Sequence, residues 1–141
     1  MDDPYELERF VIAQDSNGSY ARAVAELRDG RKLSHWIWFV FPQIAGLGFS
    51  AMSKRYSITS LEEAGAYLQH PVLGPRLAEC ARILVATEGE SAEDILGEVD
   101  AMKLRSSMTL FMTAGPDEPA FGEVLEKYFD GEPDEATLEL L

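Results

Sequence analysis

The chain has 141 residues, which predicts one domain, and its composition of 46% hydrophobic and 26% charged residues excludes a wholly disordered protein. Its net charge of −13 excludes binding of duplex DNA through general electrostatics, and its single cysteine excludes an internal disulfide. No apolar run approaches the roughly 20 residues of a membrane span, and the acidic start is unlike a signal peptide, so we expect a cytoplasmic protein with no membrane partner.

Glycine, proline and capping side chains divide the chain into helical segments, and strand signals are almost absent. The predicted helices cover residues 4–14, 19–27, 34–42, 61–69, 71–85, 100–113 and 119–129, with a single helical turn at 91–97. The residues expected to begin or cap them include Asp3, Ser34, Ser60, Pro71, Ser91, Asp100 and Pro119. The fold class is therefore all-α, with residues 1–141 forming a single-domain orthogonal array of about seven helices.

Two segments are predicted to be less regular. The apolar run 34–42 fits a buried helix or a strand, and we favour a helix. Residues 43–59 contain two glycines and predict a loop. The acidic C-terminal tail, from about residue 131, is expected either to fray or to add a last helical turn from Asp134.

The window between Gly30 and Ser60 contains no acidic residue, although the chain as a whole is strongly acidic. Its cationic side chains, including one histidine, are Arg31, Lys32, His35, Lys54 and Arg55. Cations gathered in an acidic chain indicate a pocket or face that attracts phosphate or carboxylate. The alternative is that these side chains pair with acidic residues elsewhere, above all with those of the tail.

Aromatic residues lie inside the same basic window, at Trp36, Trp38, Phe39 and Phe41. Aromatic rings beside cations can stack on a base or a nicotinamide. The alternative is that they fill the core, where such side chains contribute most to the burial energy. The two tryptophans are the better ligand candidates, because an indole N–H needs a hydrogen-bond partner.

Two polar side chains interrupt the apolar stripe of the first predicted helix. Gln14 lies between Leu7 and Phe10 on the helical wheel, and a buried amide without hydrogen bonds costs about 1–3 kcal/mol. Gln14 is therefore expected either to cap the next helix or to contact a ligand. Glu8 lies at the edge of the stripe, where a half-shielded carboxyl could serve as an acid or base, the alternative being an ordinary exposed glutamate.

The segment 103–111 carries polar side chains on both flanks of a buried stripe. Lys103 and Ser107 lie one turn apart on one flank, and Arg105 and Thr109 lie one turn apart on the other. They predict either a phosphate site or hydrogen bonds to the carbonyls of neighbouring helices.

The sequence lacks a glycine-rich phosphate loop, a dinucleotide fingerprint and the spacing of zinc ligands. We therefore expect no metal and no cofactor. Cys80 lies on an apolar helical face and predicts a buried, inert thiol.

Several blocks of this sequence resemble the bacterial family called domain of unknown function 1810. The blocks are residues 9–14, Gly30-Arg31-Lys32, residues 35–43 with Gly46-Leu47-Gly48, and residues 103–111. The block His-Trp-x-Trp-Phe-x-Phe-Pro-Gln is the most specific of these. The resemblance covers nearly the whole chain and implies an all-helical fold, but it implies no particular reaction.

A weaker resemblance concerns the first predicted helix. The segment Glu8-x-Phe10-x-x-Ala13-Gln14 is similar to one in the NADAR superfamily, which acts on N-glycosidic bonds of ADP-ribose-type nucleotides. Asp15 stands where that superfamily usually has lysine, which is a departure from its pattern. This resemblance implies that Glu8 would supply acid–base chemistry.

We therefore expect a pocket for a phosphate-bearing, nucleotide-like ligand such as ADP-ribose, with N-glycosidic hydrolysis as the reaction if the chain is an enzyme. The alternative is a non-enzymatic module that binds a protein partner through the acidic C-terminal region. The residues assigned to the site are Glu8 and His35 for catalysis and Gln14, Arg31, Lys32, Trp36, Trp38, Gln43, Lys103 and Ser107 for ligand binding.

Overall fold

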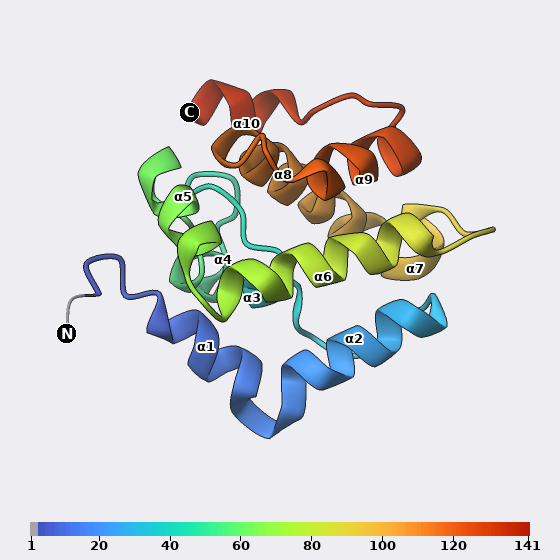
Figure 1. Ribbon diagram of the computed structural model, residues 1–141, viewed down its shortest axis with the longest axis horizontal. Coiled ribbons are helices and arrows are strands. Elements are labelled where there is room, and N and C mark those ends of the chain that lie inside the picture. The colour runs from blue at the N-terminus through green and yellow to red at the C-terminus, as the bar shows by residue number, and fades with distance from the viewer. Residues whose placement is uncertain (1–2) are drawn as a thin grey trace.

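The computed structural model describes residues 3–141, which form helices joined by short connections (Figure 1). The α-helical segments in this range are α1 (Glu8–Asp15), α2 (Ser19–Asp29), α3 (Ile37–Val40), α4 (Ala51–Arg55), α5 (Leu61–Gln69), α6 (Leu73–Ala86), α7 (Ala92–Leu96), α8 (Glu98–Ala114), α9 (Pro119–Phe129) and α10 (Glu135–Leu140). Within residues 3–141, the β-type pairing is limited to one isolated bridge between Ile44 and Ile58. The all-α prediction is confirmed, and single-turn helices raise the number of segments above seven.

Helix α6 runs through the middle of the fold and separates two groups of helices (Figure 1). Helices α1 and α2 lie on one side of it, and α8, α9 and α10 lie on the other. Helices α2, α5 and α9 pack against α6, whereas α8 contacts α3, α5, α7, α9 and α10. None of the helices formed by residues 3–141 combines the length and hydropathy needed to cross a bilayer.

A row of aromatic rings links four helices through the core. Phe10 of α1 meets Tyr67 of α5 edge-on, with 5.1 Å between ring centroids, and Tyr67 lies 5.2 Å from Phe111 of α8. Phe111 lies 6.1 Å from Phe121 of α9. All four residues are fully buried. Because aromatic side chains bury large apolar areas, this row stabilises the packing of segments that are far apart in the sequence.

Three predicted helix starts are confirmed. Ser60 Oγ accepts the backbone N–H of Glu63 at 3.1 Å and caps α5. Ser91 and Asp94 form a reciprocal capping box at α7, with both hydrogen bonds at 3.0 Å. Pro119 occupies the first position of α9. These starts were predictable because each depends on residues no more than three positions apart.

The first helix begins four residues later than predicted. The side chain of Asp3 accepts the N–H groups of Leu7 and Glu8 at 2.8 and 3.0 Å, so it caps α1 from across an intervening turn. That turn places Glu6 at a φ of +52°, which is not a helical conformation. The prediction that the helix starts at Pro4 is therefore wrong.

The apolar run 34–42 forms only the single turn α3, and Ser34 does not cap it. The N–H and hydroxyl of Ser34 both donate to the carboxylate of Glu26 on α2 instead. The predicted loop 43–59 contains α4, which Ser50 caps by accepting the N–H of Ser53 at 3.1 Å. Tertiary contacts therefore shorten one predicted helix, and a local cap creates another within the loop.

Two later helix starts also differ from the predictions. Helix α6 begins two residues after Pro71, where Nδ1 of His70 accepts the N–H groups of Val72 and Leu73 at 3.1 and 3.2 Å. Helix α8 begins two residues before Asp100. Asp100 therefore lies inside the first turn and not at the cap, and its carboxylate pairs with Lys32.

The acidic C-terminal tail contains helix α10, which packs on α8. The guanidinium of Arg105 donates to the carbonyl oxygens of Glu132 and Pro133 at 3.0 and 3.2 Å. Thr109 Oγ1 accepts the N–H of Asp134 at 2.9 Å. Arg105 and Thr109 therefore bind the backbone of a neighbouring segment, which was the structural alternative to a phosphate site.

Candidate ligand-binding sites

The structure places the predicted site residues in different environments. Gln14, Trp36 and Ser107 are buried, Lys32, Trp38, Gln43 and Lys103 are partly exposed, and Glu8, Arg31 and His35 are exposed. Gln43 lines a hollow of about 330 Å³ beside the loop that precedes α4. Glu8, His35, Trp36 and Lys103 line none of the hollows described below.

Four of the predicted residues come together around Asp100. Lys32 Nζ lies 2.9 Å from Asp100 Oδ2, and Lys103 Nζ lies 3.9 Å from Asp100 Oδ1. The same two ammonium groups lie 5.1 Å from the ring centroids of Trp36 and Trp38, respectively. We call these five residues the Asp100 cluster. Sequence reasoning missed Asp100 as a member, although its position three residues before Lys103 was a usable signal.

Trp36 is held in place by Glu26, another residue that sequence reasoning missed. Glu26 Oε1 accepts hydrogen bonds from Trp36 Nε1 at 2.9 Å and from the N–H groups of Leu33 and Ser34 at 2.8 and 2.9 Å. Burial raises the pKa of Glu26, but the hydrogen bonds from Ser34, Trp36 and Leu33 outweigh that effect and lower the pKa to about 2. The Trp36 indole therefore has its partner within the protein.

Two polar atoms, one in the Asp100 cluster and one on α8 next to it, have no hydrogen-bond partner among residues 3–141. They are Trp38 Nε1 and Ser107 Oγ, and both are buried. Ser107 lies one turn beyond Lys103 on α8, and Lys103 lies over the Trp38 ring. Burying a polar atom without a partner costs free energy, so these two atoms are the least well satisfied polar groups in this part of the fold.

We expect Ser107→Ala to leave the free energy of unfolding unchanged or to raise it by up to about 1 kcal/mol, because the hydroxyl makes no hydrogen bond. The matched control is Ser106→Ala, which should destabilise the protein. Ser106 Oγ donates to the carbonyl of Met102 at 3.1 Å and lies 3.2 Å from Asp134 Oδ2. Urea unfolding measures both variants. Greater destabilisation by Ser107→Ala than by Ser106→Ala would contradict this expectation.

Gln14 has its hydrogen bonds within the core. Its Nε2 donates to the carbonyl of Phe39 at 2.7 Å and to the Tyr67 hydroxyl at 3.3 Å, and its Oε1 accepts from Arg76 at 3.1 Å. Burial also raises the pKa of Tyr67, which keeps that hydroxyl protonated. Gln14 therefore connects α1, α3, α5 and α6, and it neither caps the next helix nor needs a ligand.

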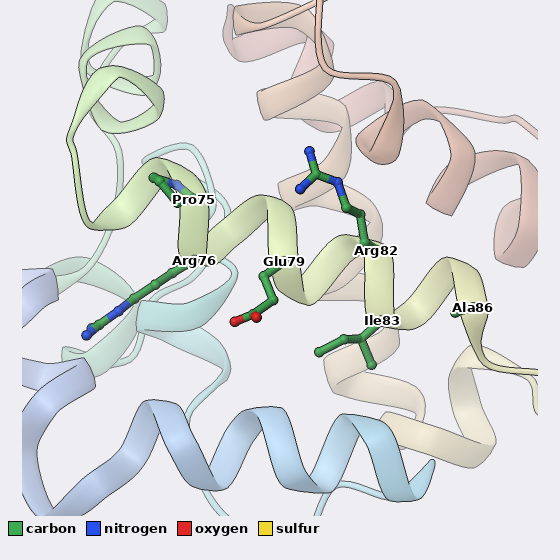
Figure 2. Close-up of a pocket in the computed structure, with 6 residues that line it drawn as sticks. All are labelled: Pro75, Arg76, Glu79, Arg82, Ile83 and Ala86. Atoms are coloured by element: carbon green, nitrogen blue, oxygen red, sulfur yellow. The ribbon is translucent and has the colours of Figure 1, made fainter.

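A hollow of about 550 Å³ lies along α6 (Figure 2). Its charged side chains are already engaged: Arg76 lies 2.9 Å from Asp15 Oδ1, Arg82 pairs with Glu118, and Glu79 accepts a tyrosine hydroxyl. In Figure 2, Arg76 and Glu79 point toward α1 and α2, whereas Arg82 points away from them. Because each of these charged groups already has a partner, the hollow offers few free groups to a charged ligand.

A second hollow, of about 500 Å³, lies between the start of α1 and the C-terminal end of α4. We call it the basic hollow, and it is lined by Pro4, Tyr5, Glu6, Arg9, Lys54, Arg55, Ser57, Thr59 and Glu63. Arg9 holds its two walls together. Its guanidinium donates to the carbonyls of Arg55 and Ser57 at 3.0 and 2.9 Å and pairs with Glu63 at 3.1 Å.

Lys54 and Arg55 differ from Arg9 because they have no acidic partner. Among residues 3–141, no carboxylate oxygen lies within 4.0 Å of the side-chain nitrogens of either residue. The Arg55 guanidinium lies 5.4 Å from the ring centroid of Tyr56, a contact that positions it without neutralising it. Two unpaired cations in a hollow of this size can attract and hold an anionic small molecule.

The described residues show no arrangement for a metal. Residues 3–141 contain no group of three or more His, Cys, Asp or Glu side chains placed to hold an ion. Cys80 is buried as predicted, and burial raises the pKa of its thiol to about 12. A thiol in this state is a poor nucleophile and a poor metal ligand.

Comparisons with known proteins agree with this architecture. The chain is similar to the crystal structure of the conserved hypothetical protein Rv1873 from Mycobacterium tuberculosis, with 52% identity and a TM-score of 0.96 over 99% of this chain and 98% of that chain. No curated protein matches it. The family model described as "Protein of unknown function (DUF1810)" matches residues 4–141. This protein therefore belongs to the DUF1810 family.

Proposed function

We propose that this protein binds a phosphate-bearing small molecule, such as a nucleotide, in the basic hollow. The observation that carries the proposal is that Lys54 and Arg55 line a hollow of about 500 Å³ and have no acidic partner among residues 3–141. A guanidinium can bind a phosphate through two parallel hydrogen bonds, and an ammonium adds a compact positive charge. Tyr5, in the same lining, supplies an aromatic ring for a base.

We propose ligand binding at this hollow and no catalytic reaction. Glu8 is exposed on α1 and is not part of the lining of the basic hollow, although its neighbour Arg9 is. The acid–base role that the weaker resemblance implied for Glu8 therefore has no geometric support at this hollow. Glu6 and Glu63 are the carboxylates that line it, and Glu63 is held by Arg9 and Thr59.

The alternative function, capture of a protein partner by the acidic tail, has less support from the fold. The tail backbone is held against α8 by Arg105 and Thr109. Leu140 of α10 also packs over Gly46, and its methyl groups would lie only 3.4 Å from the Cβ of any larger residue at that position. A docked helix leaves only its exposed side chains for a partner.

A thermal-shift experiment tests the proposed function. We expect a panel of phosphate-bearing ligands, including ADP-ribose and ATP, to raise the melting temperature, because a ligand that binds only the folded state stabilises it. The double variant Lys54→Ala/Arg55→Ala should remove the shift. Raising the salt concentration should reduce it, since the contacts are exposed ion pairs.

The matched control is Lys103→Ala, which removes a cation from the Asp100 cluster and leaves the basic hollow intact. This variant should keep the ligand-induced shift. Loss of the shift in Lys103→Ala but not in the double variant would assign the ligand to the Asp100 cluster and overturn the proposed site. No shift with any member of the panel would overturn the proposed function.

A further inference from the structure

We infer that Glu6 makes the basic hollow selective for phosphate esters that carry a hydrogen-bond donor, an amine or a hydroxyl, on the group attached to the phosphate. The inference rests on the proposed phosphate binding by Lys54 and Arg55 and adds the class of molecule that they would hold. The observation behind it is the carboxylate of Glu6, which lines the hollow and forms no ion pair among residues 3–141.

Glu6 lines the same hollow as Lys54 and Arg55 but is paired with neither. Among residues 3–141, no cationic nitrogen lies within 4.0 Å of the Glu6 carboxylate. The other carboxylate of the hollow, Glu63, is 1% exposed and accepts hydrogen bonds from Thr59 at 2.9 and 2.7 Å. The carboxylate of Glu63 therefore binds groups of the protein itself, whereas the exposed carboxylate of Glu6 can contact solvent or a ligand.

Glu6, Lys54 and Arg55 line one hollow without forming ion pairs with one another, so their charged groups remain free to contact a bound molecule. A phosphate bound by Lys54 and Arg55 would direct its ester group toward the remaining wall, which includes Glu6. A carboxylate accepts hydrogen bonds from N–H and O–H groups but donates none. It also repels a nearby phosphate, so a ligand without a donor loses affinity where a ligand with a donor gains it.

Hydrogen bonds hold the backbone at Glu6 in an unusual conformation. Its φ of +52° is in the left-handed region, which costs a residue other than glycine on the order of 1 kcal/mol. The turn is fixed on both sides, because the Glu6 N–H donates to Asp3 O at 3.0 Å and its carbonyl accepts from the Arg9 N–H at 3.1 Å and from Arg9 Nη1 at 2.9 Å. Glu6 therefore extends from a hydrogen-bonded turn that forms part of the lining of the hollow.

The test uses three phosphate monoesters of nearly equal size: ethyl phosphate, 2-hydroxyethyl phosphate and 2-aminoethyl phosphate. Isothermal titration calorimetry measures the Kd of each for the full chain at low salt. We expect affinity to rise in that order, with 2-aminoethyl phosphate binding at least about fivefold more tightly than ethyl phosphate, because a charged hydrogen bond is gained.

The variant Glu6→Gln keeps the size of the side chain and removes its charge. It should weaken the binding of 2-aminoethyl phosphate and strengthen that of ethyl phosphate, whereas a purely structural role would move both affinities in one direction. Glu6→Gly tolerates the positive φ, so it provides a second, folded variant without the carboxylate and should behave in the same way.

The possible failures are distinguishable. Equal affinities for the three esters, or Glu6→Gln changing all of them in one direction, would overturn the role of Glu6 and leave the phosphate proposal standing. No binding of any ester to the unmodified protein would overturn the role of Glu6, and if the nucleotide panel also gave no thermal shift, the proposed function would be overturned with it.

Discussion

Glu26→Ala is expected to lower the free energy of unfolding by about 3–5 kcal/mol. The substitution removes the acceptor for Trp36 Nε1–H and for the N–H groups of Leu33 and Ser34. Each of these groups is buried or partly buried, and a buried donor without an acceptor costs about 1–3 kcal/mol. Urea unfolding followed by tryptophan fluorescence measures the loss.

Glu26→Gln is the matched control at this position. Its side-chain carbonyl can accept the same three hydrogen bonds but carries no charge, so the expected loss is smaller, about 1–2 kcal/mol. If Glu26→Ala were as stable as Glu26→Gln, the hydrogen bonds of Glu26 would not be the source of its contribution.

The lowered pKa of Glu26 also predicts a pH dependence of stability. Its folded-state pKa of about 2 lies below the ordinary value of 4.5, so the unfolded state binds the proton first as the pH falls. The stabilisation is therefore fully present above about pH 4.5 and is lost as the pH falls toward 2. The stability difference between the unmodified protein and Glu26→Gln should shrink over that range, and a constant difference would contradict the assignment.

Gly74→Ala is expected to destabilise the protein by about 3 kcal/mol or more, through a clash between helices. A Cβ at position 74 would lie 2.1 Å from the carbonyl oxygen of Leu68 and 3.0 Å from its carbonyl carbon. Both atoms belong to the backbone of α5, so they cannot rotate away as a side chain could. Helices α5 and α6 would have to separate, and the core contacts between them would be lost.

Gly65→Ala provides the contrast, because Gly65 lies inside α5 and a Cβ there would meet no atom within 4 Å. Alanine in an open helical position should stabilise the protein by up to about 1 kcal/mol, since it lowers the conformational entropy of the unfolded chain. Thermal unfolding followed by circular dichroism measures both variants. Similar effects of the two substitutions would exclude the clash as the cause.

The helices that could be predicted from the sequence are those whose boundaries depend on neighbouring residues. Ser60 and Ser91 cap their helices through N–H groups three positions away, and Pro119 is suited to a first helical turn by its own ring. The start of α1 was mispredicted because Asp3 reaches across a turn to Leu7 and Glu8. The segment around Ser34 was mispredicted because Glu26, on another helix, holds it in an irregular conformation.

The candidate site was predictable only in outline. The absence of acidic residues between Gly30 and Ser60 pointed to cations available for an anion. It could not show that Lys32 is paired with Asp100, 68 positions away, whereas Lys54 and Arg55 have no acidic partner among residues 3–141. Glu6 and Arg9 carried no signal that they would form the opposite wall of the basic hollow.

The sequence by itself determined the all-α class, the caps of several helices and the acidic net charge, because these depend on composition or on interactions within a few residues. Only the tertiary structure decided which charges are paired, which polar groups are buried and where a hollow forms. Ion pairs such as Arg9 with Glu63 join residues 54 positions apart, and their existence depends on how the helices pack around the aromatic core.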